Sequence, residues 1–262
     1  MIPKIIHYCW FGGKPIPEAY RQYMESWRKF FPDYNIKEWN ETNFDVHCCK
    51  YVEQAYEAKK WAFVSDYARF YALYKEGGIY FDTDIEVIKS FDDLIDCSSF
   101  FGFSSPNNLT LPVFGSDCNQ NCIKYILDYY NTRNFVNEDG SYDTTTIEIT
   151  AKKILVEKYN LQMNGSYQEL SEGIKIYPKE FLYSTDWRTG VIEMTPQLHI
   201  IHYAEASWLS DNARKSAIRR RMLIKRYGVN VGSILDDGVT YYQEYGVINF
   251  LKKIVGKIFS KR

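Results

Sequence analysis

The stretch that decides the fold reads Gly77-Gly78-Ile79-Tyr80-Phe81-Asp82-Thr83-Asp84-Ile85-Glu86. Its alternation predicts a strand over residues 79–88, in which Tyr80, Asp82, Asp84 and Glu86 share one face. The two Asp Cα atoms would then lie about 6.6 Å apart. Carboxylates placed in this way can converge on a hard divalent cation, and without one they would repel each other. Asp-Thr-Asp is also common in a solvated turn at the end of a strand, so the tripeptide alone does not decide between these readings.

Outward from this stretch, helical and strand-like segments alternate. Residues 50–76 read as one or two helices that end at Gly77-Gly78, a good C-cap. Strand, helix and strand also precede them, and this order predicts an α/β fold with a mostly parallel central sheet. The expected segments are strands at 5–11 and 34–39 and helices at 19–31, 120–131 and 146–159.

The helix before the Asp-containing strand has two unlike faces. One carries an aromatic stripe, which we interpret as core, and the other carries small residues together with Asp66 and Arg69. Charges that are buried in a protein must be paired or bound to a ligand. The two residues are therefore either a half-buried ion pair of little energetic value or part of a ligand site.

Composition and short motifs argue against several classes of function. The chain has 262 residues, 17% aromatic residues and a net charge of −1, so bulk charge does not indicate a nucleic-acid binder. Four His and no repeated CxxC pair argue against a zinc site. GxGxxG and Walker A sequences are absent. We expect no signal peptide and no membrane span, and hence a cytoplasmic protein whose six cysteines are reduced.

Two segments together resemble glycosyltransferase family 32. They are Trp61-Ala62-Phe63-Val64-Ser65-Asp66-Tyr67-Ala68-Arg69 and Gly77-Gly78-Ile79-Tyr80-Phe81-Asp82-Thr83-Asp84. The opening residues 2–10 with Gly12-Gly13, and the stretch 39–45, are similar to bacterial members of that family. The likeness covers about the first 100 residues. The whole pattern is specific, whereas the Asp-Thr-Asp triplet alone is not.

The resemblance implies a GT-A type fold and a metal-dependent, retaining transferase that uses a nucleotide-sugar donor. It implies that Asp84 ligates Mn²⁺ or Mg²⁺, and that Asp82 touches the ribose or the sugar and reaches the same metal. Asp66 and Arg69 would hold the donor sugar and its phosphate side. Further donor contacts would come from His7, Cys9, Trp10, Ser65 and Tyr80.

A second, weaker likeness lies at residues 199–208. By resemblance, His202 would be a late metal or phosphate ligand and Trp208 a donor contact; a plain core strand is the alternative. The chain has His202-Tyr203 where many relatives have two adjacent His, which leaves the exact ligand open. The residues that bind the acceptor should lie in the middle of the chain, where the sequence shows no clear motif, and we nominate no catalytic base. Its candidates are Asp117, Asn119, Asp143, Thr144 and Thr145.

The C-terminal part is basic. Residues 211–262 hold 12 Lys and Arg against 4 Asp and Glu, whereas residues 1–210 hold 20 against 29. Residues 246–262 place apolar side chains at helical spacing among lysines, which predicts either a helix bound to an anionic membrane or one packed on the body. We therefore expect a GT-A domain over 1–210, a basic helical region over 211–262, and a cytoplasmic protein that is peripheral at the inner face of the membrane.

The function predicted from the sequence is sugar transfer to a glycan or lipid-linked acceptor in surface polysaccharide or capsule synthesis. No nucleic-acid partner is expected. One alternative keeps the fold and glycosylates a protein side chain, as the toxins of this type do. The other is a non-catalytic carbohydrate-binding protein, which would keep the aromatic residues but would not need both charged pairs.

Overall fold

The structure is a computed structural model that describes residues 1–186, 189–204 and 211–259, without the side chains of 211, 248, 250 and 251–259. The chain divides into two compact units. The first comprises residues 1–185 and 192–204, and the second comprises 186–191 and 205–262.

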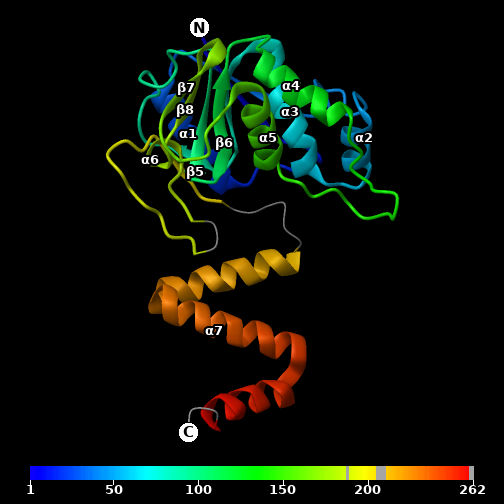
Figure 1. Ribbon diagram of the computed structural model, residues 1–262, viewed down its shortest axis with the longest axis vertical. Coiled ribbons are helices and arrows are strands. Elements are labelled where there is room, and N and C mark those ends of the chain that lie inside the picture. Colours follow the sequence, from blue (N-terminus) through cyan, green and yellow to red (C-terminus); the bar gives the residue numbers. More distant parts are fainter. Residues whose placement is uncertain (187–188, 205–210, 260–262) are drawn as a thin grey trace. The chain divides into compact units, whose positions relative to one another are not determined.

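The first unit contains a seven-stranded sheet of order β2-β1-β3-β6-β5-β8-β7 and a two-stranded sheet of β4 and β9 (Figure 1). The strands are β1 (Ile5–Cys9), β2 (Asn35–Trp39), β3 (Gly78–Phe81), β4 (Ile85–Val87), β5 (Ser99–Ser105), β6 (Asn108–Ser116), β7 (Gln168–Leu170), β8 (Ile174–Tyr177) and β9 (Ile200–His202). The helices are α1 (Glu18–Phe30), α2 (Lys50–Glu57), α3 (Trp61–Glu76), α4 (Asn121–Asn131), α5 (Ile147–Tyr159) and α6 (Lys179–Leu182), with a 3₁₀ turn at Ser171–Gly173.

In the large sheet, all strands run in one direction except β6 and β7, which are antiparallel to their neighbours. The predicted α/β class, with a mostly parallel central sheet flanked by helices and a C-terminal helical region, is confirmed. Helices α3, α4 and α5 stand together beside the sheet in Figure 1. The predicted helix and strand segments before residue 77 agree with the structure to within a few residues.

Strand β3 lies between two hydrophobic cores because its side chains alternate. Ile79 and Phe81 pack with Trp27 of α1, whereas Tyr80 packs with α3 on the opposite face. The aromatic stripe of α3 is largely buried, as predicted. Gly78 begins the strand at φ +112°, and a Cβ there would lie 2.5 Å from the carbonyl oxygen of Ile5, so a side chain has no room.

The predicted continuous strand over residues 79–88 is wrong. Strand β3 ends at Phe81, residues 82–84 form a turn, and β4 continues in the separate two-stranded sheet beside β9. The turn is closed by a hydrogen bond from the amide of Ile85 to the carbonyl of Asp82 at 3.2 Å. Alternation of side chains continues through such a turn, so the sequence pattern did not reveal the break.

The second unit contains helix α7 (Asp211–Phe259), interrupted at Gly228 and Gly246. At Gly228 φ is +79°, a value that glycine adopts without strain. Arg219, before this break, reaches across to Asp236 at 2.7 Å and to Thr240 at 2.8 Å. These bonds join the segments on either side of Gly228 as a helical hairpin. Among the described residues, no helix combines the length and apolar character that a membrane crossing requires.

Candidate active site

Three potential metal ligands converge at the carboxyl end of β3. Asp82 and Asp84 come from the turn after that strand, and His202 ends β9. One ligand atom from each lies within 4.8 Å of the other two, and all three side chains are partly buried. Because β4 pairs with β9 in the register Ile85–His202, the turn and the histidine are fixed side by side. The convergence was predicted, although it arises from a turn and a strand pairing rather than from one strand face.

The guanidinium of Arg69 joins Asp66 to Asp82. Its Nη2 lies 3.2 Å from Asp66 Oδ1, and its Nη1 lies 3.3 Å from Asp82 Oδ1. Its remaining donors bond the carbonyls of Ser65 and Leu111, and the group stacks on the Tyr80 ring at 4.6 Å. Arg69 is only 7% exposed. The two carboxylates are thus held on one rigid cation, which fixes the separation of α3 from the Asp-Thr-Asp turn.

Asp66 is an unusual carboxylate because it is 8% exposed. Burial raises the pKa of Asp66 to about 7, and the neighbouring Glu148 and Asp82 add to this, while Arg69 opposes it. The pKa of Asp82 is also raised, mainly by burial, against the effect of Arg69. Perturbed carboxylates of this kind concentrate at functional sites.

His202 is held by carboxylates. Burial lowers the pKa of His202, but Asp84, Asp82 and Glu148 together outweigh burial and leave this pKa raised. Its Nε2 lies 3.4 Å from Asp84 Oδ1. An imidazole held this close to two aspartates matches the mixed oxygen and nitrogen donor set of a divalent metal site.

The donor contacts predicted near the end of β1 are His7, Cys9 and Trp10, and they differ in how far they are buried. His7 is fully buried, and its two ring nitrogens are bonded to the Gly77 carbonyl and the Trp39 indole. Both ring nitrogens of His7 are thus engaged inside the fold, which argues against its predicted contact with the nucleotide. Cys9 is buried beside Arg69 and Asp82. Trp10 is partly exposed and packs edge-on against Tyr20 at 6.0 Å.

Of the other predicted donor contacts, Tyr80 bonds Asp82 and Ser65 bonds Arg69 through its carbonyl oxygen. Tyr80 is buried and donates its hydroxyl to Asp82 Oδ1 at 3.0 Å. Ser65 is partly buried and donates to the carbonyl of Trp61 at 3.0 Å. Trp208 lies outside the described residues. The roles of Ser65, Tyr80, Cys9 and Trp10 in donor binding stay predictions.

The acceptor candidates from the middle of the chain separate into two groups. Asp117 and Asn119 follow β6, whose end at Ser116 pairs with Gly78, so they lie at the opposite end of β3 from Asp82. Asp117 is bonded to the N-terminal amine at 2.7 Å. These two acceptor candidates therefore lie away from the metal-ligand cluster, because β6 runs antiparallel to β3 and ends beside the start of that strand.

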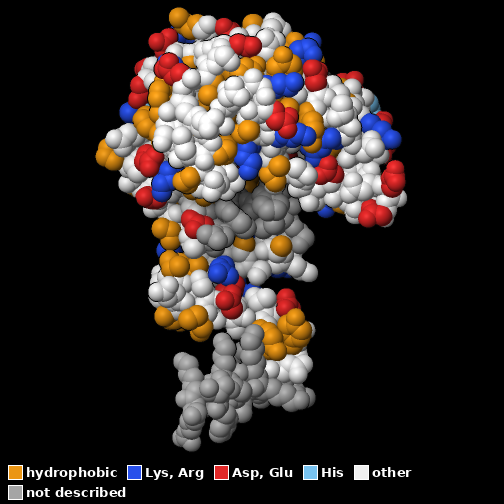
Figure 2. All heavy atoms as spheres, in the orientation of Figure 1, with side chains coloured by type: hydrophobic (Ala, Val, Ile, Leu, Met, Phe, Trp, Pro, Cys, Tyr) orange, Lys and Arg blue, Asp and Glu red, His pale blue; other side chains and the backbone are white. Residues whose placement is uncertain are grey.

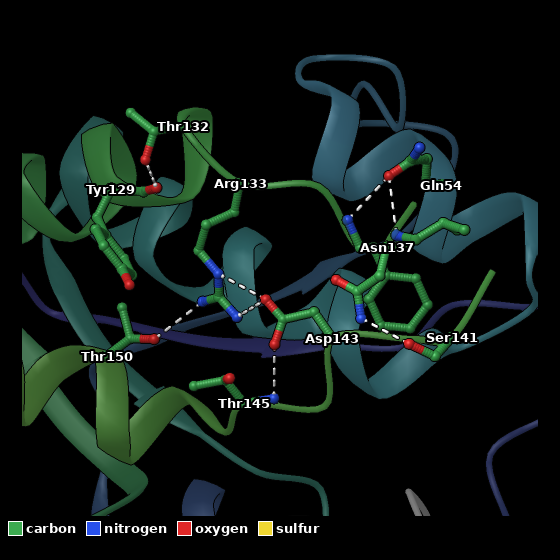
Figure 3. A network of polar contacts seen from close by, with 11 residues as sticks. Gln54, Tyr129, Thr132, Arg133, Asn137, Ser141, Asp143, Thr145 and Thr150 are labelled. Atoms are coloured by element: carbon green, nitrogen blue, oxygen red, sulfur yellow. Dashed lines mark hydrogen bonds and ion pairs between the residues drawn. The ribbon is translucent and has the colours of Figure 1, made fainter. Parts of the chain in front are cut away.

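Asp143 and Thr145 belong instead to a polar network around Arg133 (Figure 3). Arg133 Nη2 lies 2.5 Å from Asp143 Oδ2, and Arg133 Nη1 donates to Thr150 at 3.1 Å. Asp143 Oδ1 also accepts the amide of Thr145 at 3.0 Å. Asp143 is thus committed to holding the loop in front of α5, whereas Thr144 is exposed.

Sequence reasoning missed two features of this site. The carbonyl of Leu111, a ligand of Arg69, carries no sequence signal because it is backbone. Glu148 carried a signal, since it is an acidic residue in the first turn of a predicted helix. Its carboxylate acts electrostatically on both Asp66 and His202, which lie on separate elements.

Comparison with known proteins finds similarity over part of the chain. Residues 17–101 match the family described as "Glycosyltransferase sugar-binding region containing DXD motif". An inositol phosphoceramide mannosyltransferase of Schizosaccharomyces pombe is 29% identical over 122 residues, which are 44% of this chain and 33% of that protein. An uncharacterized glycosyltransferase of Acanthamoeba polyphaga mimivirus is 33% identical over 110 residues, 38% of this chain and 43% of that protein. The chain thus spans less than half the length of either relative.

Two solved structures are also similar. The PaToxG glycosyltransferase has a TM-score of 0.47 and 21% identity, with 60% of this chain and 70% of that one covered. A glycosyltransferase involved in glycosylation of the major capsid of PBCV-1 has a TM-score of 0.36 and 13% identity, with 69% and 84% covered.

Proposed function

We propose that this chain is a GT-A type glycosyltransferase that moves a sugar from a nucleotide-sugar donor to a glycan or lipid-linked acceptor. One observation carries the proposal. A buried arginine joins Asp66 to Asp82 directly beside the Asp84–His202 pair. Burying charged side chains costs free energy of folding, and a non-catalytic binding module would have no need of so many partly buried charges. The sugar-binding region at residues 17–101 contains Asp66, Arg69, Asp82 and Asp84.

The donor set fits a divalent cation. Asp82, Asp84 and His202 offer two carboxylate oxygens and one imidazole nitrogen, and we propose that they hold Mn²⁺ or Mg²⁺. When bound, such an ion neutralises the charge that develops on a leaving diphosphate. Tyr80 and Arg69 keep Asp82 in place through the bonds already described, as partners behind a metal ligand commonly do.

The remaining groups would handle the donor sugar. Asp66 presents a carboxylate on the α3 side of the site, and Arg69 keeps it oriented. Carboxylates bind sugar hydroxyls by accepting their hydrogen bonds. We propose that Asp66 binds the transferred sugar, that Arg69 lies on the phosphate side, and that transfer proceeds with retention of configuration.

The acceptor proposal rests on resemblance. The relative from fission yeast is named for mannosyl transfer to inositol phosphoceramide, a lipid. Together with the likeness to bacterial polysaccharide transferases, this favours a lipid-linked or glycan acceptor in surface polysaccharide or capsule synthesis.

The test is hydrolysis of nucleotide sugars by the full chain. A panel of nucleotide sugars is screened with Mn²⁺ for release of nucleoside diphosphate. We expect at least one donor to be hydrolysed, and excess EDTA and Asp84→Asn to abolish the release. Glu193→Gln is the matched control, because Glu193 is an exposed acid paired with Lys179. Absence of metal-dependent hydrolysis with every donor would favour the carbohydrate-binding alternative.

We also propose that the second unit docks on an anionic membrane at the cytoplasmic face. Figure 2 shows hydrophobic side chains on the surface of this unit. On α7, Met222 and Ile234 are 66% and 70% exposed, and Ile218 is 46% exposed. The net charge of +8 over residues 211–262 complements anionic lipids, which attract each basic side chain by about 1 kcal/mol. The apolar side chains of residues 250–259, on which the sequence prediction relied, lie outside the described residues.

The docking test compares vesicles with and without anionic lipid. We expect the full chain to sediment with anionic vesicles and to be released in part by salt. Replacing Ile218, Met222 and Ile234 by Ser should reduce binding without lowering donor hydrolysis. Equal sedimentation of this variant and the wild type would contradict docking through this face.

A further inference from the structure

The two-stranded sheet that carries part of the metal-ligand cluster is small. Its strands β4 and β9 share three residue pairs, from Ile85–His202 to Val87–Ile200. Two strands paired by themselves are marginally stable at best, so a ladder this short does not fix two metal ligands on its own. Because Asp84 immediately precedes β4 and His202 ends β9, the separation of these ligands depends on what holds the small sheet in place.

Helix α1 holds strand β4. The indole of Trp27, which is fully buried, donates a hydrogen bond to the carbonyl of Ile85 at 2.8 Å. The hydroxyl of Ser26 accepts the amide of Val87 at 2.8 Å, so β4 is bonded to the helix as well as to β9. These two bonds fix β4, and with it the turn that contains Asp84, against α1.

Tyr203 provides the matching contacts for the end of β9. Its amide donates to the carbonyl of Asp84 at 3.1 Å, and its hydroxyl donates to the carboxylate of Glu86 at 2.7 Å. Its ring stacks face to face on that of Tyr23 in α1, with the centroids 4.3 Å apart and the planes inclined by 11°. One residue directly after His202 thus joins β9 to the Asp84 turn, to β4 and to α1.

The backbone around Tyr203 sets the direction of the His202 side chain. Consecutive side chains of a strand point to opposite sides, so His202 lies in the ligand cluster while Tyr203 lies against α1. The amide of His202 is bonded to the buried Ser184 at 3.0 Å, and the contacts of Tyr203 fix the chain that follows. Ala204 comes next with φ +50°, a left-handed value that persists in such a residue only where surrounding contacts hold it.

We propose that Tyr203 is a positioning residue of the metal centre. By stacking on Tyr23 it holds His202 at the distance from the two aspartates at which all three side chains bind one divalent cation. This inference rests on the proposed function, to which the cation belongs. Groups behind a metal ligand orient that ligand, and their loss commonly weakens metal binding by about 10–100-fold. Glu86→Gln would keep an acceptor oxygen for the Tyr203 hydroxyl, so the stack on Tyr23 is the contact to remove.

The experiment measures the Mn²⁺ affinity of the full chain by electron paramagnetic resonance, with Mn²⁺ alone and with uridine or guanosine diphosphate. The melting temperature in EDTA is the second readout. Tyr23→Leu removes the ring from α1, Tyr203→Leu removes it from the end of β9, and the double variant completes a cycle. Tyr203→Phe keeps the ring. Tyr125→Leu is the matched control, because this tyrosine of α4 is 37% exposed and its ring lies 6.5 Å from that of Tyr159.

We expect Tyr23→Leu and Tyr203→Leu each to weaken Mn²⁺ binding by about 10-fold. The double variant should bind Mn²⁺ no more weakly than either single variant, because both changes remove the same contact. Tyr203→Phe and Tyr125→Leu should bind Mn²⁺ as the wild type does. If Tyr203→Leu does not fold, Tyr23→Leu decides alone, since Tyr23 lies on a separate helix and is not a member of the ligand cluster.

Wild-type Mn²⁺ affinity in Tyr23→Leu would overturn the inference and leave the proposed metal site standing, and a lower melting temperature in that variant would then make the stack purely structural. A double variant whose loss of affinity equals the product of the two single losses would also overturn it, because the two rings would then act separately. A wild-type chain that binds no Mn²⁺ would instead refute the cation site of the proposed function itself.

Discussion

Replacing Asp66 by Asn should stabilise the fold while abolishing activity. Burial raises the pKa of Asp66 from 3.8 to about 7. Between these two values the folded state keeps a proton that the unfolded chain releases. By linkage, the Asp66 contribution to the free energy of unfolding falls as pH rises from about 4 to about 7, and it is constant outside this window.

The size of the effect follows from the two pKa values. A difference of about three pH units corresponds to about 4 kcal/mol. Asn has nearly the same shape and never ionises, so the variant avoids this cost, and Arg69 keeps Asp82 as its ionic partner. We expect wild type and variant to be equally stable near pH 4, and the variant to be more stable at pH 8 by up to about 4 kcal/mol.

Urea unfolding at pH 4, 6 and 8, in EDTA, measures this difference. Asp143→Asn is the control with the opposite sign, because hydrogen bonds from Thr145 and Arg133 outweigh burial and lower the pKa of Asp143. That variant should be less stable than the wild type at pH 8, and its deficit should shrink as pH falls below 4. A difference for Asp66→Asn that does not change between pH 4 and 8, or that turns destabilising at pH 8, would refute the reasoning.

Three further changes test the surroundings of the site. Arg69→Lys keeps the charge but loses the planar fork that bonds Asp66 and Asp82 together, so donor hydrolysis should fall by about 10–100-fold; retained activity in a charge-swapped Asp66→Arg, Arg69→Asp double variant would instead make this pair purely structural. Tyr80→Phe removes the hydroxyl that bonds Asp82 and should weaken Mn²⁺ binding about 10-fold in a titration, and unchanged binding would argue against Asp82 as a ligand. Arg133→Met leaves the Asp143 carboxylate without its ionic partner and should cost about 3 kcal/mol of stability in calorimetry, and an unchanged stability would show that this pair does not hold the loop before α5.

Helices and strands could be predicted from the sequence where a periodic pattern of apolar side chains stopped at a clear end signal, such as a glycine. Helix α3 ends at Gly77 as expected, and α5 was placed within one residue of its observed start. The end of β3 before Asp82 was missed, because polar and apolar residues keep alternating through the turn at residues 82–84. The structural reason for the break is that β4 leaves the large sheet to pair with β9, which lies more than a hundred residues later in the sequence.

For the candidate site, local motifs identified the residues near β3, and long-range contacts decided the rest. Asp82 and Asp84 were recognisable from their spacing, and Asp66 and Arg69 from the small-residue face of their helix. Resemblance assigned roles to these four and added His202. The bonding of His7 inside the fold was not foreseen, because its neighbours in sequence do not reveal that Gly77 and Trp39 occupy both ring nitrogens. Glu148 escaped notice, because an acidic residue in the first turn of a helix is ordinary, and its effect on the pKa of Asp66 depends on the fold.

The central claim is that Asp82, Asp84 and His202 hold the divalent cation of a nucleotide-sugar site. The most direct measurement is Mn²⁺ binding by electron paramagnetic resonance, with and without nucleoside diphosphate, for the wild type, Asp84→Asn and Glu86→Gln. Glu86 is the control, because it lies two residues further on and its carboxylate accepts the Tyr203 hydroxyl at 2.7 Å. We predict tight Mn²⁺ binding by the wild type and by Glu86→Gln, and binding at least about 100-fold weaker in Asp84→Asn. Equal Mn²⁺ binding by all three proteins, or none by the wild type, would contradict the claim.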